Sequence, residues 1–245
     1  MVNFSGELIP LTQQGRIYST VFVTIMAVGV VVFWGPETLT KKKDKGKKMN
    51  KISKKKGIIR RFFGKGVCPY QLSFILDSTL RKLILSPEKL ADRLHLKEDS
   101  KVLELGCGSG YFSVEVAKRL PKGHLELLDL QKEMLEKARR KIEAKGLKNV
   151  GYTQGDAINL PFADNEFDVV FLVAVLGEVT EPEKCLKEIY RVLKPEGLLS
   201  ITEQPGDPDF VALEKVKELA EKQGFEFIEK FGKKRNFTAN FKKKK

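Results

Sequence analysis

The chain has 245 residues, of which 42% are hydrophobic and 31% are charged, and its formal net charge is +13. This length and apolar content allow one domain with a full hydrophobic core plus an appendage, and they exclude a chain that is disordered throughout. The three cysteines, Cys68, Cys107 and Cys185, form no CxxC pair and only two histidines are present, so the sequence predicts neither a structural zinc site nor a disulfide framework.

An uncharged segment near the N-terminus is followed by a strongly basic one. Residues 17–36 contain no charged side chain, and a helix of roughly 20 residues crosses the ~30 Å hydrocarbon layer of a membrane. Residues 40–66 hold thirteen Lys and Arg against the single acid Asp44. Positive charge beside a span favours the cytoplasmic side, so we expect a single-pass membrane protein whose following domain lies on the cytoplasmic side. The expected parts are a tail at 1–16, a transmembrane helix at 17–36, a basic linker at 37–66 and a domain at 67–245.

This reading of the N-terminal part has alternatives. A cleaved signal peptide would place its basic residues before the apolar run instead of after it. A buried core helix is a further option, weakened because a charged linker separates this apolar segment from the domain. The linker lysines can attract anionic lipid headgroups or act only as a spacer. The remaining residues, 67–245, carry only +2, which argues against a nucleic-acid partner for the domain.

Short β-rich runs alternate with helical runs through the domain. Such alternation predicts an α/β fold, with a mostly parallel sheet and helices on both faces. The last two β-rich runs have no helix between them and predict an antiparallel hairpin. Two amphipathic helices are expected first, at 70–85 and 86–96. The expected strands are 101–105, 124–130, 150–154, 167–173, 197–202, 225–231 and 235–241, and the helices between them are 111–120, 131–146, 182–193 and 209–224.

The first expected strand leads into a glycine-rich stretch, GCGSG at 106–110. In an open parallel sheet, ligands bind beyond the carboxyl ends of the strands, and glycines there let the backbone turn tightly and approach a ligand closely. The GxGxG spacing differs from the GxGxxG of dinucleotide-binding proteins. Glu104 stands two residues before the first glycine, where a carboxylate would repel a pyrophosphate and suit a cationic cofactor.

Residues 101–203 resemble the class I S-adenosylmethionine (SAM)-dependent methyltransferases, with the motifs in the same order. The resemblance implies a Rossmann-like sheet of seven strands and SAM as the cofactor. Glu104 and the three glycines match the first motif of that family. Asp129 ends the second expected strand, and in the family this acid bonds both ribose hydroxyls, which suits two adjacent acceptor oxygens.

The resemblance extends the expected cofactor site to further positions. It places Met134 near the adenine, and it implies that the Asp156 side chain accepts a hydrogen bond from the exocyclic amine. The alternatives are a core position for Met134, a turn role for Asp156 and a solvated strand-end acid at Asp129. Cys107 is expected to be a neutral spacer, because no histidine is placed to activate it. The expected cofactor-binding residues are Glu104, Gly106, Cys107, Gly108, Ser109, Gly110, Tyr111, Asp129, Leu130, Met134, Gly155, Asp156, Ala157 and Val173; no metal is expected.

The wider match is closest to small-molecule and lipid methyltransferases related to the quinone C-methyltransferases, although the N-terminal motif of the quinone enzymes is absent. A membrane anchor concentrates lipid-borne substrates, so we expect methyl transfer to a small amphipathic or lipid acceptor. The alternatives are transfer to a protein or a soluble small molecule, with the anchor used only for location, and a SAM-binding scaffold without catalysis.

Two glutamates are candidates for accepting a proton from the acceptor. Glu178 and Glu203 lie at or beyond the ends of the fourth and fifth expected strands, where an acceptor would bind. The alternative for Glu178 is a helix cap or a solvent-facing position.

Overall fold

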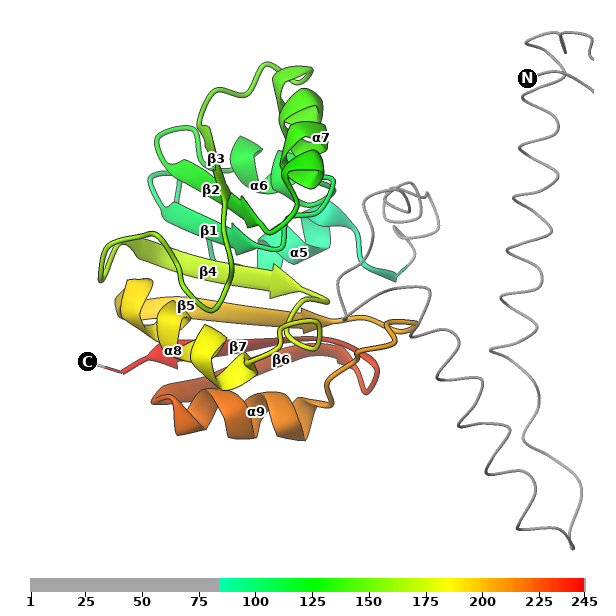
Figure 1. Cartoon of the computed structure of the whole chain (residues 1–245), viewed down its shortest axis with the longest axis vertical. Helices are drawn as coiled ribbons and strands as arrows, with labels where there is room; N and C mark the ends of the chain where they lie inside the picture. The colour runs from blue at the N-terminus through cyan, green and yellow to red at the C-terminus, as the bar shows by residue number, and fades with distance from the viewer. Residues whose placement is uncertain (1–83, 245) are drawn as a thin grey trace, which may run out of the picture. The chain divides into compact units, whose positions relative to one another are not determined.

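The structure is a computed structural model that describes residues 84–244. Within this range the strands form one seven-stranded sheet in the order β3-β2-β1-β4-β5-β7-β6 (Figure 1). The first five strands pair in parallel, and β7 pairs antiparallel with both β5 and β6. The strands are β1 (Lys101–Leu105), β2 (His124–Asp129), β3 (Val150–Gln154), β4 (Phe167–Val173), β5 (Leu193–Glu203), β6 (Phe225–Lys233) and β7 (Asn236–Lys243).

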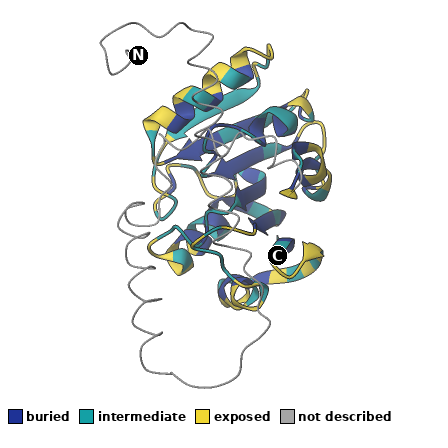
Figure 2. Cartoon of the chain, turned by 90° about the vertical axis from the view of Figure 1, so that its right-hand side faces the viewer, coloured by how far each residue is buried: buried dark blue, intermediate teal, exposed yellow. Residues whose placement is uncertain are grey.

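Helices cover both faces of this sheet. Buried side chains of the first three helices pack with Val102 and Leu125 on one face, and those of the last two pack with Leu103 and Ile201 on the other. Figure 2 shows buried strands between helices whose outward faces are exposed. The predicted parallel sheet with a closing antiparallel hairpin is confirmed. The helices are α5 (Pro87–Arg93), α6 (Ser113–Lys118), α7 (Lys132–Glu143), α8 (Pro182–Val192) and α9 (Leu213–Lys222).

Two sequence patterns account for this packing. The central strands are apolar on both faces, since Val102 and Leu103 are adjacent and both fully buried, as expected for a sheet covered on both sides. Helix α7 buries Met134, Ala138 and Ile142 at intervals of four residues, which places them on one side of the helix. The opposite side of α7 carries its charged residues.

Several predicted boundaries differ from the structure, and three elements begin two or more residues away from the predicted start. Strand β5 begins at Leu193 instead of residue 197 and pairs with β4 through a register shift near its start. Helix α6 begins at Ser113 instead of residue 111. Helix α9 begins at Leu213 instead of residue 209, because the Asp207 carboxylate accepts a hydrogen bond from the Asp209 backbone N–H and holds this segment in a turn.

The predicted membrane anchor at 17–36 and the basic linker at 37–66 lie outside the described residues, as does most of the amphipathic helix predicted at 70–85. In the part of the chain that the structure describes, no helix has both the length and the apolar character needed to cross a membrane. Residues 84–244 also contain no group of three or more His, Cys, Asp or Glu side chains that could hold a metal ion.

Candidate cofactor-binding site

The glycine-rich loop turns sharply as it leaves β1. Gly106, Gly108 and Gly110 have φ angles of +65°, +54° and +75°, a region of backbone conformation that favours glycine. The loop is held against the neighbouring strand, because the Gly106 N–H donates to the Leu128 carbonyl at 2.8 Å. The three glycines therefore define a fixed bend of bare backbone at the carboxyl edge of the sheet.

The surroundings of this bend leave no room for larger side chains. A Cβ atom added to Gly106 would lie 2.5 Å from Cγ2 of Val175, in the loop after β4. A Cβ atom added to Gly110 would lie 2.9 Å from the Cβ of Ala138 on α7. The glycines thus allow both the β4–α8 loop and helix α7 to approach the bend closely.

The Asp129 carboxylate connects the bend to the end of β2. Its two oxygens accept hydrogen bonds from the Gly108 and Gln131 backbone N–H groups, each at 2.9 Å. A carboxylate oxygen can accept a second hydrogen bond, so each of these oxygens keeps acceptor capacity. Burial raises the pKa of Asp129 above its usual range.

Apolar residues next to Asp129 provide a surface for a flat ring. Leu130 is 52% exposed, one of the three large hydrophobic side chains exposed in the described part of the chain. Met134 is buried in the first turn of α7. Leu130, a predicted cofactor-binding residue, is therefore open to a ligand, whereas Met134 is buried and its predicted contact with adenine stays a prediction.

Glu104 is buried at the end of β1 and has a partner within the domain. The Ser113 hydroxyl donates to its Oε2 atom at 2.6 Å, so Glu104 ties β1 to the first turn of α6. The carboxylate lies immediately before the glycine bend, and its contact with a cofactor stays a prediction.

The loop after β3 brings a further predicted residue to the same edge. The Gly155 N–H donates to the Asp129 carbonyl at 3.1 Å, so the two strand ends are adjacent. Asp156 is exposed and accepts from the Ile158 N–H. Arg191 anchors the continuation of this loop by donating to the Leu160 and Phe162 carbonyls.

The other predicted residues occupy supporting positions. Burial, together with the Glu104 and Asp129 carboxylates, raises the pKa of the Cys107 thiol well above its usual range, so Cys107 is a neutral spacer, as predicted. Ser109 is buried, whereas Tyr111, Ala157 and Val173 are partly buried and pack against the core.

The two candidate proton acceptors lie in different surroundings. Glu178 lies in the β4–α8 loop, and its N–H donates to the carbonyl of Val175, the residue that contacts the glycine bend. Glu203 is fully buried at the end of β5, and its side chain accepts from the Val211 N–H at 3.3 Å. Strand alternation places Glu203 on the same face as Ile201, which is covered by α8 and α9. Glu178 is therefore the better placed of the two.

Sequence reasoning missed the two residues that follow β4. Ala174 has a φ of +56°, a strained conformation for a residue with a Cβ that is often found at functional sites. It directs the chain so that Val175 packs against Gly106. No local sequence signal marks this pair, because the contact joins loops about seventy residues apart and depends on β1 and β4 being neighbours.

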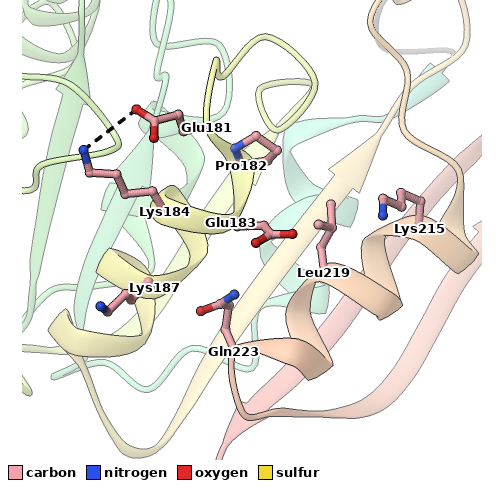
Figure 3. A pocket seen from close by; sticks show the side chains of 8 residues that line it. All are labelled: Glu181, Pro182, Glu183, Lys184, Lys187, Lys215, Leu219 and Gln223. Carbon is pink, nitrogen blue, oxygen red and sulfur yellow. Dashed lines mark ion pairs between the residues drawn. The ribbon is translucent and has the colours of Figure 1, made fainter.

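A groove between α8 and α9 is separate from this site. Figure 3 shows its lining side chains, which come from the two helices and the residue preceding α8. Its lining includes both acids and lysines, and Lys184 pairs with Glu181 at 3.8 Å. None of the predicted cofactor-binding residues lines this groove.

The residues at the glycine bend fit SAM. The bend of bare backbone would allow a ligand to approach closely. The Asp129 carboxylate can accept hydrogen bonds from a ribose diol, and Leu130 offers an apolar contact for adenine. The two buried carboxylates, Glu104 and Asp129, give the loop a negative potential that suits a cationic sulfonium and amino group.

Comparison with known families agrees with this geometry. The sequence profile of a family described as "Methyltransferase domain" matches residues 96–224, more than half of the chain. The chain belongs to this methyltransferase family. The matched range contains the glycine bend, Asp129, Asp156 and both candidate glutamates. The chain is accordingly a SAM-dependent methyltransferase, and SAM is its cofactor.

Named relatives of this methyltransferase include quinone-pathway enzymes. A "Demethylmenaquinone methyltransferase" of Lactobacillus johnsonii is 39% identical over 125 residues, which cover 49% of this chain and 51% of the relative. A "Ubiquinone/menaquinone biosynthesis C-methyltransferase UbiE" of Roseobacter denitrificans is 38% identical over 117 residues, which cover 47% of each chain. The methyltransferase spans about half the length of the curated relatives it matches.

Solved structures share the fold. A SAM-dependent methyltransferase from Aquifex aeolicus superposes with a TM-score of 0.66 at 27% identity, covering 71% of this chain and 98% of that chain. The [4+2]-cyclase SpnF has a TM-score of 0.58 at 21% identity, covering 64% of this chain and 79% of its own, a similarity of fold alone.

Substituting Gly106 tests the bend. We expect Gly106→Ala to weaken SAM binding at least tenfold, because the new Cβ meets Val175 and the residue keeps a positive φ. Equilibrium binding of radiolabelled SAM measures this, with circular dichroism to confirm folding. The control is Gly106→Ala with Val175→Ala, which removes the contacting methyl groups. Full recovery of affinity in the double variant would show that neither the positive φ nor the cofactor itself requires glycine.

Lowering the pH tests Asp129. Both carboxylate oxygens act as full acceptors only while Asp129 is ionised, so SAM affinity should fall as the pH drops through the pKa of Asp129. Because burial raises this pKa, the loss should begin at a higher pH than an ordinary aspartate would give. Asp129→Asn should bind SAM about tenfold or more weakly at pH 7, since an amide loses one acceptor oxygen, and should show a flatter pH profile. If the pH profile of SAM affinity were the same in Asp129→Asn as in the wild type, the assignment of Asp129 as a cofactor-binding residue would be contradicted.

Proposed function

We propose that the enzyme transfers a methyl group from SAM to a small amphipathic or lipid-borne acceptor, such as a ring carried on an isoprenoid chain. For the methyl donor, the supporting observation is that the Asp129 carboxylate connects the glycine bend to the end of β2. For the acceptor, the support is the printed names of the relatives and the character of the nearby loops. The alternatives are a protein or soluble small-molecule acceptor, and SAM binding without catalysis.

The loops beyond β4 and β5 are suited to an apolar acceptor. Val175, Val179, Phe210 and Val211 are partly buried there and pack against the core. A Cβ atom added to Gly177 would lie 1.8 Å from the Asp209 carbonyl oxygen, so the two loops are in close contact. Apolar side chains held by two fixed loops would exclude water from the acceptor and orient it, which supplies much of the barrier reduction in a displacement reaction.

Bound SAM supplies an electrophilic methyl group on a sulfonium, with a neutral thioether as the leaving group. The protein has to orient the acceptor atom and to receive a proton where that atom carries one. We propose Glu178 for this role because its loop contacts the glycine bend, and we keep Glu203 as the second candidate. The proton moves from the acceptor to an ionised carboxylate oxygen as the bond to the methyl group forms. Because burial raises the pKa of Glu203 to about 8, Glu203 can take this proton only in its ionised fraction.

Membrane location is part of the proposal and rests on the sequence alone. Residues 17–36 carry no charge and residues 40–66 carry thirteen Lys and Arg, the pattern of a span with its basic flank on the cytoplasmic side. An anchored enzyme would meet lipid-borne acceptors at a high local concentration.

Methyl transfer from tritiated SAM into a total membrane extract tests the acceptor class. Product label should move into the organic phase on extraction and should be absent with Gly106→Ala. Glu178→Gln should lower the rate about tenfold or more while SAM affinity stays within twofold, because the side chain is proposed to act on the acceptor. Label found only in protein or RNA would rule out the lipid acceptor, and binding without any turnover would favour the scaffold alternative.

The stability of Glu203→Gln tests the environment of the second glutamate. Burial raises the pKa of Glu203 to about 8 from its ordinary 4.5, with a smaller contribution from Asp207. The folded state therefore holds a proton that the unfolded state releases, and stability falls as the pH rises from about 4.5 to about 8. Each unit of pKa difference is worth about 1.4 kcal/mol. As the pH rises from 5 to 8.5, the free energy of unfolding of Glu203→Gln should therefore increase relative to that of the wild type by more than 1 kcal/mol. Urea unfolding measures the two free energies, and parallel pH profiles of the variant and the wild type would contradict the prediction.

A further inference from the structure

The turn between β6 and β7 carries three consecutive cations. Lys233, Lys234 and Arg235 are all exposed, and none of them takes part in an ion pair with a carboxylate of residues 84–244. The Arg235 guanidinium lies over the Phe210 ring at 5.7 Å, which holds the turn against the β5–α9 loop. The cations are therefore presented on a fixed hairpin.

The strand register places this turn at the edge of the sheet that carries the cofactor site. Glu203 at the end of β5 pairs with Phe237, and Lys233 pairs with Asn236 one step further out. The hairpin turn thus extends past the carboxyl end of β5, and the glycine bend follows the carboxyl end of β1 in the same parallel sheet (Figure 1). Both features belong to one edge of the domain.

The chain also enters the described domain at this turn. The Asn236 side-chain amide donates to the Ile84 carbonyl at 2.8 Å, and Ile84 is itself 36% exposed. The residues before it in the sequence include the basic stretch 40–66. An exposed apolar side chain and three unpaired cations therefore coincide at this turn.

The surroundings of the turn do not cancel its charge. The exposed residues of the adjacent loop are the neutral Pro205, Gly206 and Pro208. The acids of that loop, Asp207 and Asp209, are partly buried, and Asp207 is engaged by the Asp209 N–H. Glu214 in the first turn of α9 is exposed, but its one negative charge does not balance the three positive charges of the turn.

We propose that Lys233, Lys234, Arg235 and Ile84 form a docking surface for an anionic phospholipid membrane. This hairpin surface would turn the carboxyl edge of the sheet, with the methyl-transfer site, toward the lipid. A basic residue near an anionic membrane contributes roughly 1 kcal/mol of attraction, so three such residues are enough to orient a tethered domain. The inference extends the proposed membrane location and does not depend on which acceptor is methylated.

Vesicle binding by the full chain tests the hairpin surface. The quantity measured is the ratio of partitioning onto vesicles with about 30% phosphatidylglycerol to partitioning onto pure phosphatidylcholine, by flotation at low salt. Lys233→Gln/Lys234→Gln/Arg235→Gln should lower this ratio about tenfold or more, as expected for three cations at roughly 1 kcal/mol each after partial screening. Lys233→Gln/Lys234→Gln, which keeps the Arg235–Phe210 contact, should lower it by a smaller factor.

The matched control is Lys118→Gln/Lys145→Gln/Lys148→Gln. These lysines are exposed. Lys118 ends α6 and pairs with Glu115, whereas Lys145 and Lys148 lie between α7 and β3; all three are at the opposite edge of the sheet, so the net charge changes equally while the hairpin stays intact. This control should keep the wild-type ratio within about twofold. Equal losses in the hairpin and control variants would overturn the proposal, as would loss of binding to a short single-stranded RNA with unchanged vesicle binding. SAM binding measured on the same samples shows that each variant is folded, and it separates this test from failure of the methyl-transfer proposal.

Discussion

The close approach of bare backbone to the Asp129 carboxylate is the constraint on which the rest of the site depends. The carboxylate holds the Gly108 N–H from one side and the Gln131 N–H from the other, so the loop after β1 and the turn after β2 move as one unit. Burial of this carboxylate is costly, as its raised pKa shows, and the two backbone hydrogen bonds offset part of that cost. A group that is expensive to bury and keeps acceptor capacity is well suited to a ligand rich in hydroxyl groups.

The same constraint explains the arrangement around the bend. Because the glycines lack side chains, Val175 and Ala138 can contact the loop from the β4–α8 connection and from α7. The β4–α8 loop is in turn locked to the β5–α9 loop at Gly177 and Asp209. The donor site and the proposed acceptor site are therefore mechanically connected through a short series of van der Waals contacts, which favours a rigid active site over one assembled by large movements.

The proposed hairpin surface gives this edge of the sheet a second role. The proposed acceptor loops, the cationic turn and the first described residue all lie at the carboxyl edge, because parallel strands end there and the closing hairpin turns there. A domain docked through this edge would present its apolar acceptor loops to the bilayer. The small net charge of residues 67–245, +2, conceals this arrangement, because acids elsewhere in this range offset the three cations of the turn.

The sequence by itself determined the parallel sheet, its antiparallel closing hairpin and the glycine bend, because alternating patterns and glycine spacing are local consequences of backbone geometry and side-chain burial. It also identified Asp129, since a carboxylate at a strand end is recognisable from its position. Only the tertiary structure decided that Val175 packs on Gly106, that Glu203 lies on the face of the sheet covered by α8 and α9, and that the cationic turn shares an edge with the site. These relations depend on which strands are neighbours and on the face each side chain occupies, and contacts between residues far apart in the chain leave no periodic signal in the sequence.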